Sequence, residues 1–175
     1  IAVESGKTQA TYGEEVKFVF TPETGYEIKY LTVNEEQVQW ASDNTYTTTM
    51  GEYGLFVTVQ FGLENETITV NAGEHGTIEH KNKADDTQDY LYGDTAVVTV
   101  TPNEGFMIET ITVDGKAIEV PEDKKGGYSF EQLVEKDLNI SATFTDVHTI
   151  SEFTDSVINE IKNAQDIKVK LAGDV

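Results

Sequence analysis

The 175-residue sequence is strongly acidic, with 32 Asp and Glu side chains against 12 basic ones and a formal net charge of −20 at pH 7. Every basic residue is a lysine, so the chain lacks the guanidinium groups that bind phosphates in bidentate fashion, and its field repels polyanions. The composition predicts no nucleic-acid partner and no attraction to anionic membranes. The absence of cysteine excludes disulfides, thiolate metal sites and cysteine nucleophiles. No apolar run approaches the ~20 residues that span a bilayer, which predicts no membrane insertion in this segment.

The sequence contains an internal duplication. Residues 12–38 align without gaps with residues 92–118, and residues 55–61 align with residues 138–144. The identical pairs in the first alignment are Tyr12/Tyr92, Gly13/Gly93, Thr21/Thr101, Pro22/Pro102, Gly25/Gly105, Ile28/Ile108, Thr32/Thr112 and Val33/Val113. Self-similarity at a fixed spacing is typical of tandem modules. We therefore predict a first repeat at residues 1–64, clipped at its N-terminal side, and a second repeat at residues 65–146.

Apolar side chains alternate along short segments of both repeats, which predicts strands with one face in a core. In chain order the alternating sets are Val16/Phe18/Phe20, Val57/Val59/Phe61, Val98/Val100 and Ile140/Ala142/Phe144. The Pro-x-x-Gly elements at residues 22–25 and 102–105 provide a fixed φ and then a residue free to take positive φ, so they predict turns between strands. The expected fold class is all-β, with two small, mostly antiparallel modules.

One irregularity in the apolar pattern occurs in both repeats. Tyr26 and Ile28 occupy even-numbered positions, whereas Leu31 and Val33 occupy odd-numbered ones, so the two pairs would lie on opposite faces of a regular strand. The same mismatch recurs 80 positions later. A regular strand would point one of the two pairs into water. We predict a β-bulge near residues 29–30 and another near residues 109–110, which would turn both pairs toward the core.

The two repeats differ at one predicted hairpin. Val113-Asp114-Gly115-Lys116 is a strong two-residue hairpin signal, because Asp-Gly suits a type I′ turn. The corresponding Asn34-Glu35 lacks the glycine. We predict that the turn of the first repeat is strained or differently shaped.

Three aromatic residues of the first repeat form a candidate ligand-binding group: Trp40, Tyr46 and Tyr53. Trp40 and Tyr53 have no aromatic counterpart in the second repeat. With nearby Asp43 and Asn44, these rings could stack on a sugar or anchor a partner chain while forming polar contacts. The alternative is that Trp40 caps the core or buries an interface between modules.

The second repeat opens with a strand at residues 67–70, a turn at residues 73–76 and a strand at residues 77–80, which the first repeat compresses into residues 1–11. His75 and His80 fall in the turn and on the following strand, a spacing that disfavours shared metal ligation and favours solvated side chains. Asp85, Asp86 and Asp89 lie in an acidic loop without the residue order of a known Ca²⁺ loop. The sequence predicts no metal site and no cofactor.

After Phe144 the pattern changes. Val157, Ile158, Ile161 and Ala164 have helical spacing behind a possible Ser151 cap, and Ile167, Val169 and Leu171 then alternate. Residues 147–175 are thus predicted to form a helix and a strand. This segment is similar to the helical cap and first strand of parallel β-helix domains in bacterial surface proteins; the alternative is a C-terminal element packed on the second repeat.

The repeats resemble the divergent internalin-type B repeats of bacterial surface proteins. The likeness covers residues 67–144, and residues 1–61 with a clipped start. It is carried by Gly-Thr-Ile at Gly76, Tyr-Gly at Gly93, Thr-Pro-x-x-Gly-Phe at Thr101, Val-Asp-Gly at Val113 and Ile-Ser-Ala-Thr-Phe at Ile140. The resemblance implies β-grasp-like or Ig-like sandwich modules in a secreted or wall-attached protein, where they act as spacers and sometimes contact partners.

Two functions remain open at this point, and neither is enzymatic, because the sequence lacks the nucleophile-elbow, zincin and phosphate-loop motifs. The first is a stalk or spacer that presents an adjacent domain of the same protein. The second is an adhesion module for host glycan or protein. Both place the chain outside the cell or on the cell wall. A Lys–Asn isopeptide cross-link, known in wall proteins, is not readable from the sequence, although the outward parity of Lys17 argues against its taking part.

Overall fold

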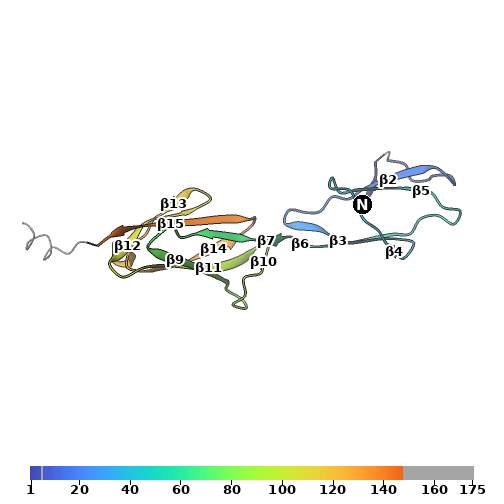
Figure 1. Cartoon of the computed structure of the whole chain (residues 1–175). Helices are drawn as coiled ribbons and strands as arrows, with labels where there is room; N and C mark the ends of the chain where they lie inside the picture. Colours follow the sequence, from blue (N-terminus) through green and yellow to red (C-terminus); the bar gives the residue numbers. More distant parts are fainter. Residues whose placement is uncertain (5, 148–175) are drawn as a thin grey trace, which may run out of the picture. The chain divides into compact units, whose positions relative to one another are not determined.

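The computed structural model describes residues 1–4 and 6–147, and this part of the chain is all-β, as predicted (Figure 1). The strands of the first repeat are β1 (Ala2–Val3), β2 (Glu15–Val19), β3 (Tyr26–Val33), β4 (Glu36–Gln37), β5 (Thr45–Thr49) and β6 (Val57–Leu63). Those of the second are β7 (Asn65–Glu66), β8 (Ile68–Asn71), β9 (Gly76–Asn82), β10 (Tyr90–Leu91), β11 (Asp94–Pro102), β12 (Phe106–Val113), β13 (Lys116–Ile118), β14 (Tyr128–Val134) and β15 (Leu138–Asp146), with a 3₁₀ turn at Glu122–Lys124. The predicted C-terminal helix and strand lie outside the described residues.

The first repeat consists of two three-stranded sheets, ordered β1-β2-β5 and β4-β3-β6, whose strands pair antiparallel. Phe20, Ile28 and Leu31 form its buried centre. Partly buried side chains from both sheets and from the segment between β4 and β5 pack around them: Phe18, Val38, Trp40, Tyr46, Val57, Val59 and Phe61. Because one apolar cluster draws on both sheets, the first repeat is a small β-sandwich.

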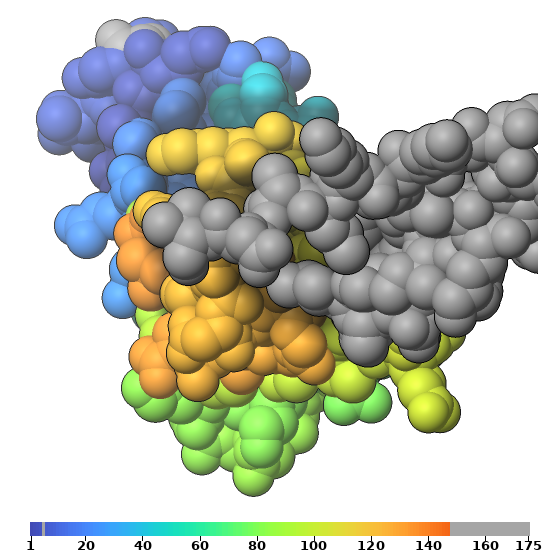
Figure 2. All heavy atoms as spheres, turned by 90° about the vertical axis from the view of Figure 1, so that its left-hand side faces the viewer, coloured from blue at the N-terminus to red at the C-terminus, as the bar shows by residue number. Residues whose placement is uncertain are grey.

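The second repeat has the corresponding sheets, ordered β14-β11-β9 and β13-β12-β15-β8, and a short β10-β7 ribbon. Its early strands (green) and late strands (orange) lie side by side, since β8 adjoins β15 (Figures 1 and 2). Its buried apolar side chains are Ile78, Tyr90, Ala96, Val98, Val100, Ile108, Ile111, Val134, Leu138, Ile140 and Ala142. No sheet of the described residues combines strands from both repeats.

Both predicted β-bulges are present. The pairing of β3 with β6 shifts register between Ile28 and Tyr30, and the pairing of β12 with β15 shifts between Ile108 and Thr110. The extra residue lets side chains on both sides of the bulge face the core, so Ile28 and Leu31 are both buried, as are their counterparts Ile108 and Ile111.

The hairpin turns of the two repeats have the same backbone shape but are formed by different residues. Asp114 and Gly115 have φ values of 50° and 75°, as a type I′ turn requires. Asn34 and Glu35 have φ values of 51° and 70°. The first repeat therefore keeps the turn geometry and holds a glutamate in the left-handed region, which confirms the predicted strain and shows no difference in shape.

Grouped by backbone proximity, the described residues form two compact units. One contains Ile1–Thr69, His80–Val98 and Phe130–Leu138, and the other contains Val70–Glu79, Thr99–Ser129 and the described residues from Asn139 onward. The boundary between residues 64 and 65 stays a prediction. Within the described residues, no helix has the length and apolar character needed to cross a membrane.

Candidate functional site

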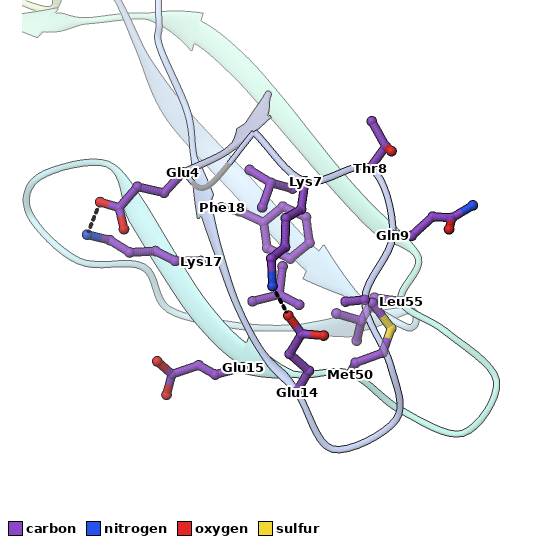
Figure 3. Close-up of a pocket in the computed structure, with 13 residues that line it drawn as sticks. Glu4, Lys7, Thr8, Gln9, Glu14, Glu15, Lys17, Phe18, Met50 and Leu55 are labelled. Atoms are coloured by element: carbon purple, nitrogen blue, oxygen red, sulfur yellow. Dashed lines mark hydrogen bonds and ion pairs between the residues drawn. The ribbon is translucent and has the colours of Figure 1, made fainter.

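The first repeat contains a cleft of about 380 Å³ beside β1 and β2 (Figure 3). Its walls come from the two strands, from the loop that joins them and from the segment between β5 and β6. The apolar lining residues are Val3, Ala10, Val16, Phe18, Met50 and Leu55, and the polar ones are Glu4, Lys7, Thr8, Gln9, Glu14, Glu15 and Lys17. The cleft therefore combines an apolar interior with a charged rim, as ligand pockets commonly do.

One residue that lines the cleft is small, and its counterpart in the second repeat is large. Ala10 corresponds to Tyr90, 80 positions later, and Tyr90 is only 3% exposed. The Tyr90 hydroxyl is 2.9 Å from Nδ1 of His80, which anchors the ring. A methyl group cannot fill the volume of a phenol ring, so Ala10 leaves space that Tyr90 occupies in the second repeat.

The matched lining positions show the same contrast. Gly13 donates to the carbonyl of Met50, and Gly93 donates to that of Val134, so Met50 and Val134 are equivalent. Val134 is fully buried, whereas Met50 is partly exposed. Leu138 is likewise buried, and its counterpart Leu55 is partly exposed.

Two ion pairs border the cleft (Figure 3). Lys7 pairs with Glu14, and Lys17 pairs with Glu4 at 2.7 Å. The hydrogen bond from Lys7 lowers the pKa of Glu14, and the bond to Glu4 raises the pKa of Lys17. All four groups are solvent-accessible, so these pairs orient the rim and add little stability. The polar lining residues are lysines, glutamates, a threonine and a glutamine.

The structure places the predicted aromatic group in two different environments. Trp40 and Tyr46 both pack against the buried centre of the first repeat. Tyr53 lies in the β5–β6 loop and is 97% exposed. Trp40 and Tyr46 thus pack on the same core cluster, and Tyr53 is not part of it.

The polar residues of the predicted group have local roles. Asp43 accepts a hydrogen bond from the Thr45 hydroxyl at 2.7 Å, which lowers the pKa of Asp43. Asn44 has a φ of 58°, and its carbonyl accepts the N–H of Phe20. Both residues therefore shape the turn that enters β5.

Sequence reasoning missed Phe56, which is 67% exposed in the same loop as Tyr53. Phe56 corresponds to Asn139, whose N–H bonds the side chain of Asp114; in the first repeat, the N–H of Phe56 bonds Asn34 in the same way. The backbone N–H therefore makes the same hydrogen bond in both repeats, while the side chain is aromatic in the first and polar in the second. An apolar residue at a position that is polar in the other copy was the available signal.

The histidines and the acidic loop of the second repeat have structural partners. His75 stacks on Phe106, with ring centroids 4.0 Å apart, while partly buried His80 bonds Tyr90. The expectation of a solvated His80 was therefore wrong, because Tyr90 covers it. Asp85 bonds Thr87, and Asp86 pairs with Lys81. The described part of the chain contains no group of three or more His, Cys, Asp or Glu placed to hold a metal ion.

Fold and site together define a class: a tandem pair of small, all-β repeats of the sandwich type. The divergent InlB B-repeat domain matches the chain twice, over residues 2–65 and 66–148. The chain belongs to this family, a repeat of the bacterial surface type, and the resemblance drawn from the sequence is confirmed. No curated protein and no solved structure matches the chain.

Proposed function

We propose that the chain is a non-catalytic repeat pair of an exported bacterial cell-surface protein, acting as a stalk that presents a neighbouring domain of the same protein. The observation that carries the proposal is the double family match, which fills residues 2–148 with repeats and leaves no separate domain among them. Consecutive folded modules add length while each keeps a core of its own, which suits a spacer.

The chemistry of the described residues supports the same function. The net charge of −20 opposes self-association and adhesion to anionic surfaces. Several polar side chains bond the backbone where strands begin or end; Asp114 accepts from Asn139, and Asp137 accepts from Thr67. These contacts stabilise the modules and are not available to a substrate.

The spacer function can be tested by anchoring Ile1 to a bead and fusing a small antibody epitope after Val175. The folded pair should increase capture of a bulky antibody relative to a length-matched chain with Leu31→Asp and Ile111→Asp, which unfolds by burying two unpaired charges. A folded stalk holds its end at a defined distance, and an unfolded one does not. Equal capture by both chains would argue against a spacer.

A second candidate function, adhesion to glycan or protein, has a specific observation in its favour. Tyr53 and Phe56 are large aromatic side chains that lie highly exposed in one loop of the first repeat. Exposed aromatic side chains are common anchors for sugars and partner proteins.

The adhesion function predicts that the full chain is retained on a glycan or host-protein array. The Tyr53→Ala/Phe56→Ala variant should lose that retention without a change in melting temperature. Trp40→Ala is the matched contrast, because Trp40 packs on the core and its loss should lower the melting temperature. An array profile unaffected by the double variant would remove this candidate.

A further inference from the structure

The chain passes from the first repeat to the second through residues 64–67, between the end of β6 and the start of β8. Each of these residues has backbone partners. Glu64 is bonded on both sides, Asn65 and Glu66 pair with β10, and Thr67 bonds the end of the loop that precedes β15. Flexible boundaries usually fall in exposed linkers that few contacts cross, so this connection has little freedom to bend.

Glu64 connects the two repeats through its backbone. Its N–H donates to the carbonyl of Gly25 at 2.9 Å, and its carbonyl accepts the N–H of Tyr92, also at 2.9 Å. The first bond is a feature of each repeat, because Val147 donates to the carbonyl of Gly105 in the same way. The second bond ties the end of the first repeat to the second.

The ring of Tyr92 lies directly against Gly25. A Cβ built on Gly25 would be 2.3 Å from Cδ1 and 2.5 Å from Cγ of that ring. The ring therefore occupies the space that the side chain of any other residue would need, and Gly25 is buried. Such close packing leaves no gap into which the two surfaces can shift.

The equivalent positions of the two repeats lack this contact. Gly105 corresponds to Gly25 and has a similar φ, 83° against 78°. It is exposed, and nothing lies within 4 Å of its Cβ position. Tyr12 corresponds to Tyr92 and is 78% exposed. These two residues therefore serve as matched controls, in which the same residue types have no ring-to-glycine packing.

Two further observations support a close connection. The side-chain amide of Asn65 donates to Glu27 of β3 at 3.4 Å, so a polar contact accompanies the packed ring. Backbone proximity also places Ile1–Thr69, His80–Val98 and Phe130–Leu138 in one compact unit. The first repeat and the adjoining part of the second thus belong to the same unit.

We propose that Gly25, Glu64 and Tyr92 form a stiff joint, which fixes the first repeat to residues 80–98 and 130–138 of the second. A ring packed on a glycine and a backbone bond on each side of Glu64 make these parts move as one body. The joint is a property of the chain that does not depend on the stalk function, because it would equally fix the direction of an adhesion loop.

The joint can be tested with two nitroxide labels at Glu36→Cys and Glu135→Cys, since the chain contains no other cysteine and both positions are exposed within the same compact unit. Pulsed electron paramagnetic resonance gives the distribution of distances between the labels. The intact joint should give one narrow distribution. Gly25→Ala, which displaces the Tyr92 ring, should widen it at least about twofold. Insertion of Gly-Ser-Gly-Ser after Glu64 provides the width of a loose joint.

Gly105→Ala is the matched control, because it adds the same left-handed strain and displaces nothing. It should leave the width unchanged. Tyr92→Ala removes the ring without adding strain and should also widen the distribution, whereas Tyr12→Ala should not. If Gly25→Ala unfolds the first repeat, as circular dichroism would reveal, the two tyrosine variants decide the question. A distribution in the unaltered chain as wide as that of the insertion, or no widening by Tyr92→Ala, would overturn the proposal. Equal widening by Gly25→Ala and Gly105→Ala would overturn it as well.

Discussion

The two repeats share their turns, bulges and strand connections, and they differ in how completely their cores are closed. The second repeat has β8 beside β15 and Tyr90 in the position of Ala10, and its central side chains are almost fully buried. In the first repeat Ala10 lines a cleft, and the core residues Met50 and Leu55 beside it are only partly buried. The comparison indicates that the shared motif residues specify the strands and turns, while residues outside the motifs determine how completely each core is buried.

The largest expected effect is at Tyr90, the buried ring at the end of the second repeat's core. Tyr90→Ala removes a buried ring and its bond to His80, and should lower the free energy of unfolding of the second repeat by about 4 kcal/mol. Chemical denaturation followed by NMR signals from each repeat would measure this loss.

The reciprocal variant, Ala10→Tyr, sharpens the same comparison. If the cleft is the space that Tyr90 fills in the second repeat, this change should raise the stability of the first repeat. Destabilisation by Ala10→Tyr would show that the two positions are not equivalent.

The next largest effect concerns the glycine at which β9 of the second repeat begins. A Cβ added at Gly76 would lie 2.1 Å from Cζ of Phe144, so Gly76→Ala should lower the melting temperature and cost about 2 kcal/mol through overpacking. Gly126→Ala is the control, because nothing lies within 4 Å of its Cβ position. Equal effects of both changes would argue against close packing of β9 on β15.

A smaller effect is expected at the hairpin. Glu35 has a φ of 70°, and Glu35→Gly should stabilise the first repeat by about 1 kcal/mol by relieving left-handed strain. Gly115→Ala at the equivalent turn should lower the stability of the second repeat by a similar amount, because φ is 75° at this position. Nothing lies within 4 Å of the added Cβ, so backbone strain alone should account for the loss. Calorimetry of both variants checks the pair, and changes of the same sign would contradict the equivalence of the turns.

The smallest effect is a pH dependence confined to the second repeat. Burial lowers the pKa of His80 below its ordinary value of 6.5, so the unfolded state binds more protons than the folded state once the pH falls below about 6.5. The stability contributed by neutral His80 is therefore complete above that pH and decreases as the pH falls toward the folded pKa. Thermal unfolding of the wild type and His80→Gln between pH 7.5 and 5.5 tests this, and parallel pH profiles would contradict it.

Much of the fold was predictable because its signals are local. The bulges follow from the parity conflict between Ile28 and Leu31, and the second hairpin follows from Asp114-Gly115, so each needs only a few neighbouring residues. The family was recognised from the same turn and strand motifs. Local signals also set the order of the strands along the chain.

The candidate site was less predictable because it depends on what surrounds each residue. An unshared aromatic is equally consistent with a core position and an exposed one, and the structure assigns Trp40 to the first environment and Tyr53 to the second. The cleft depends on Ala10 in place of Tyr90, a difference visible in the alignment only once the burial of Tyr90 is known.

The bulge at Ile28/Tyr30 limits how such repeats can change in length. Deleting one residue there would restore regular alternation and turn one of the two buried pairs of β3 toward water, so the strand tolerates neither a loss nor a gain of a single position. The spacing between the repeats, 80 positions through residue 38 and 83 from residue 55 onward, shows where additions have been accommodated. Peptide tags or foreign epitopes are therefore best grafted between β4 and β5 of the first repeat or between β13 and β14 of the second, where the two repeats already differ in length.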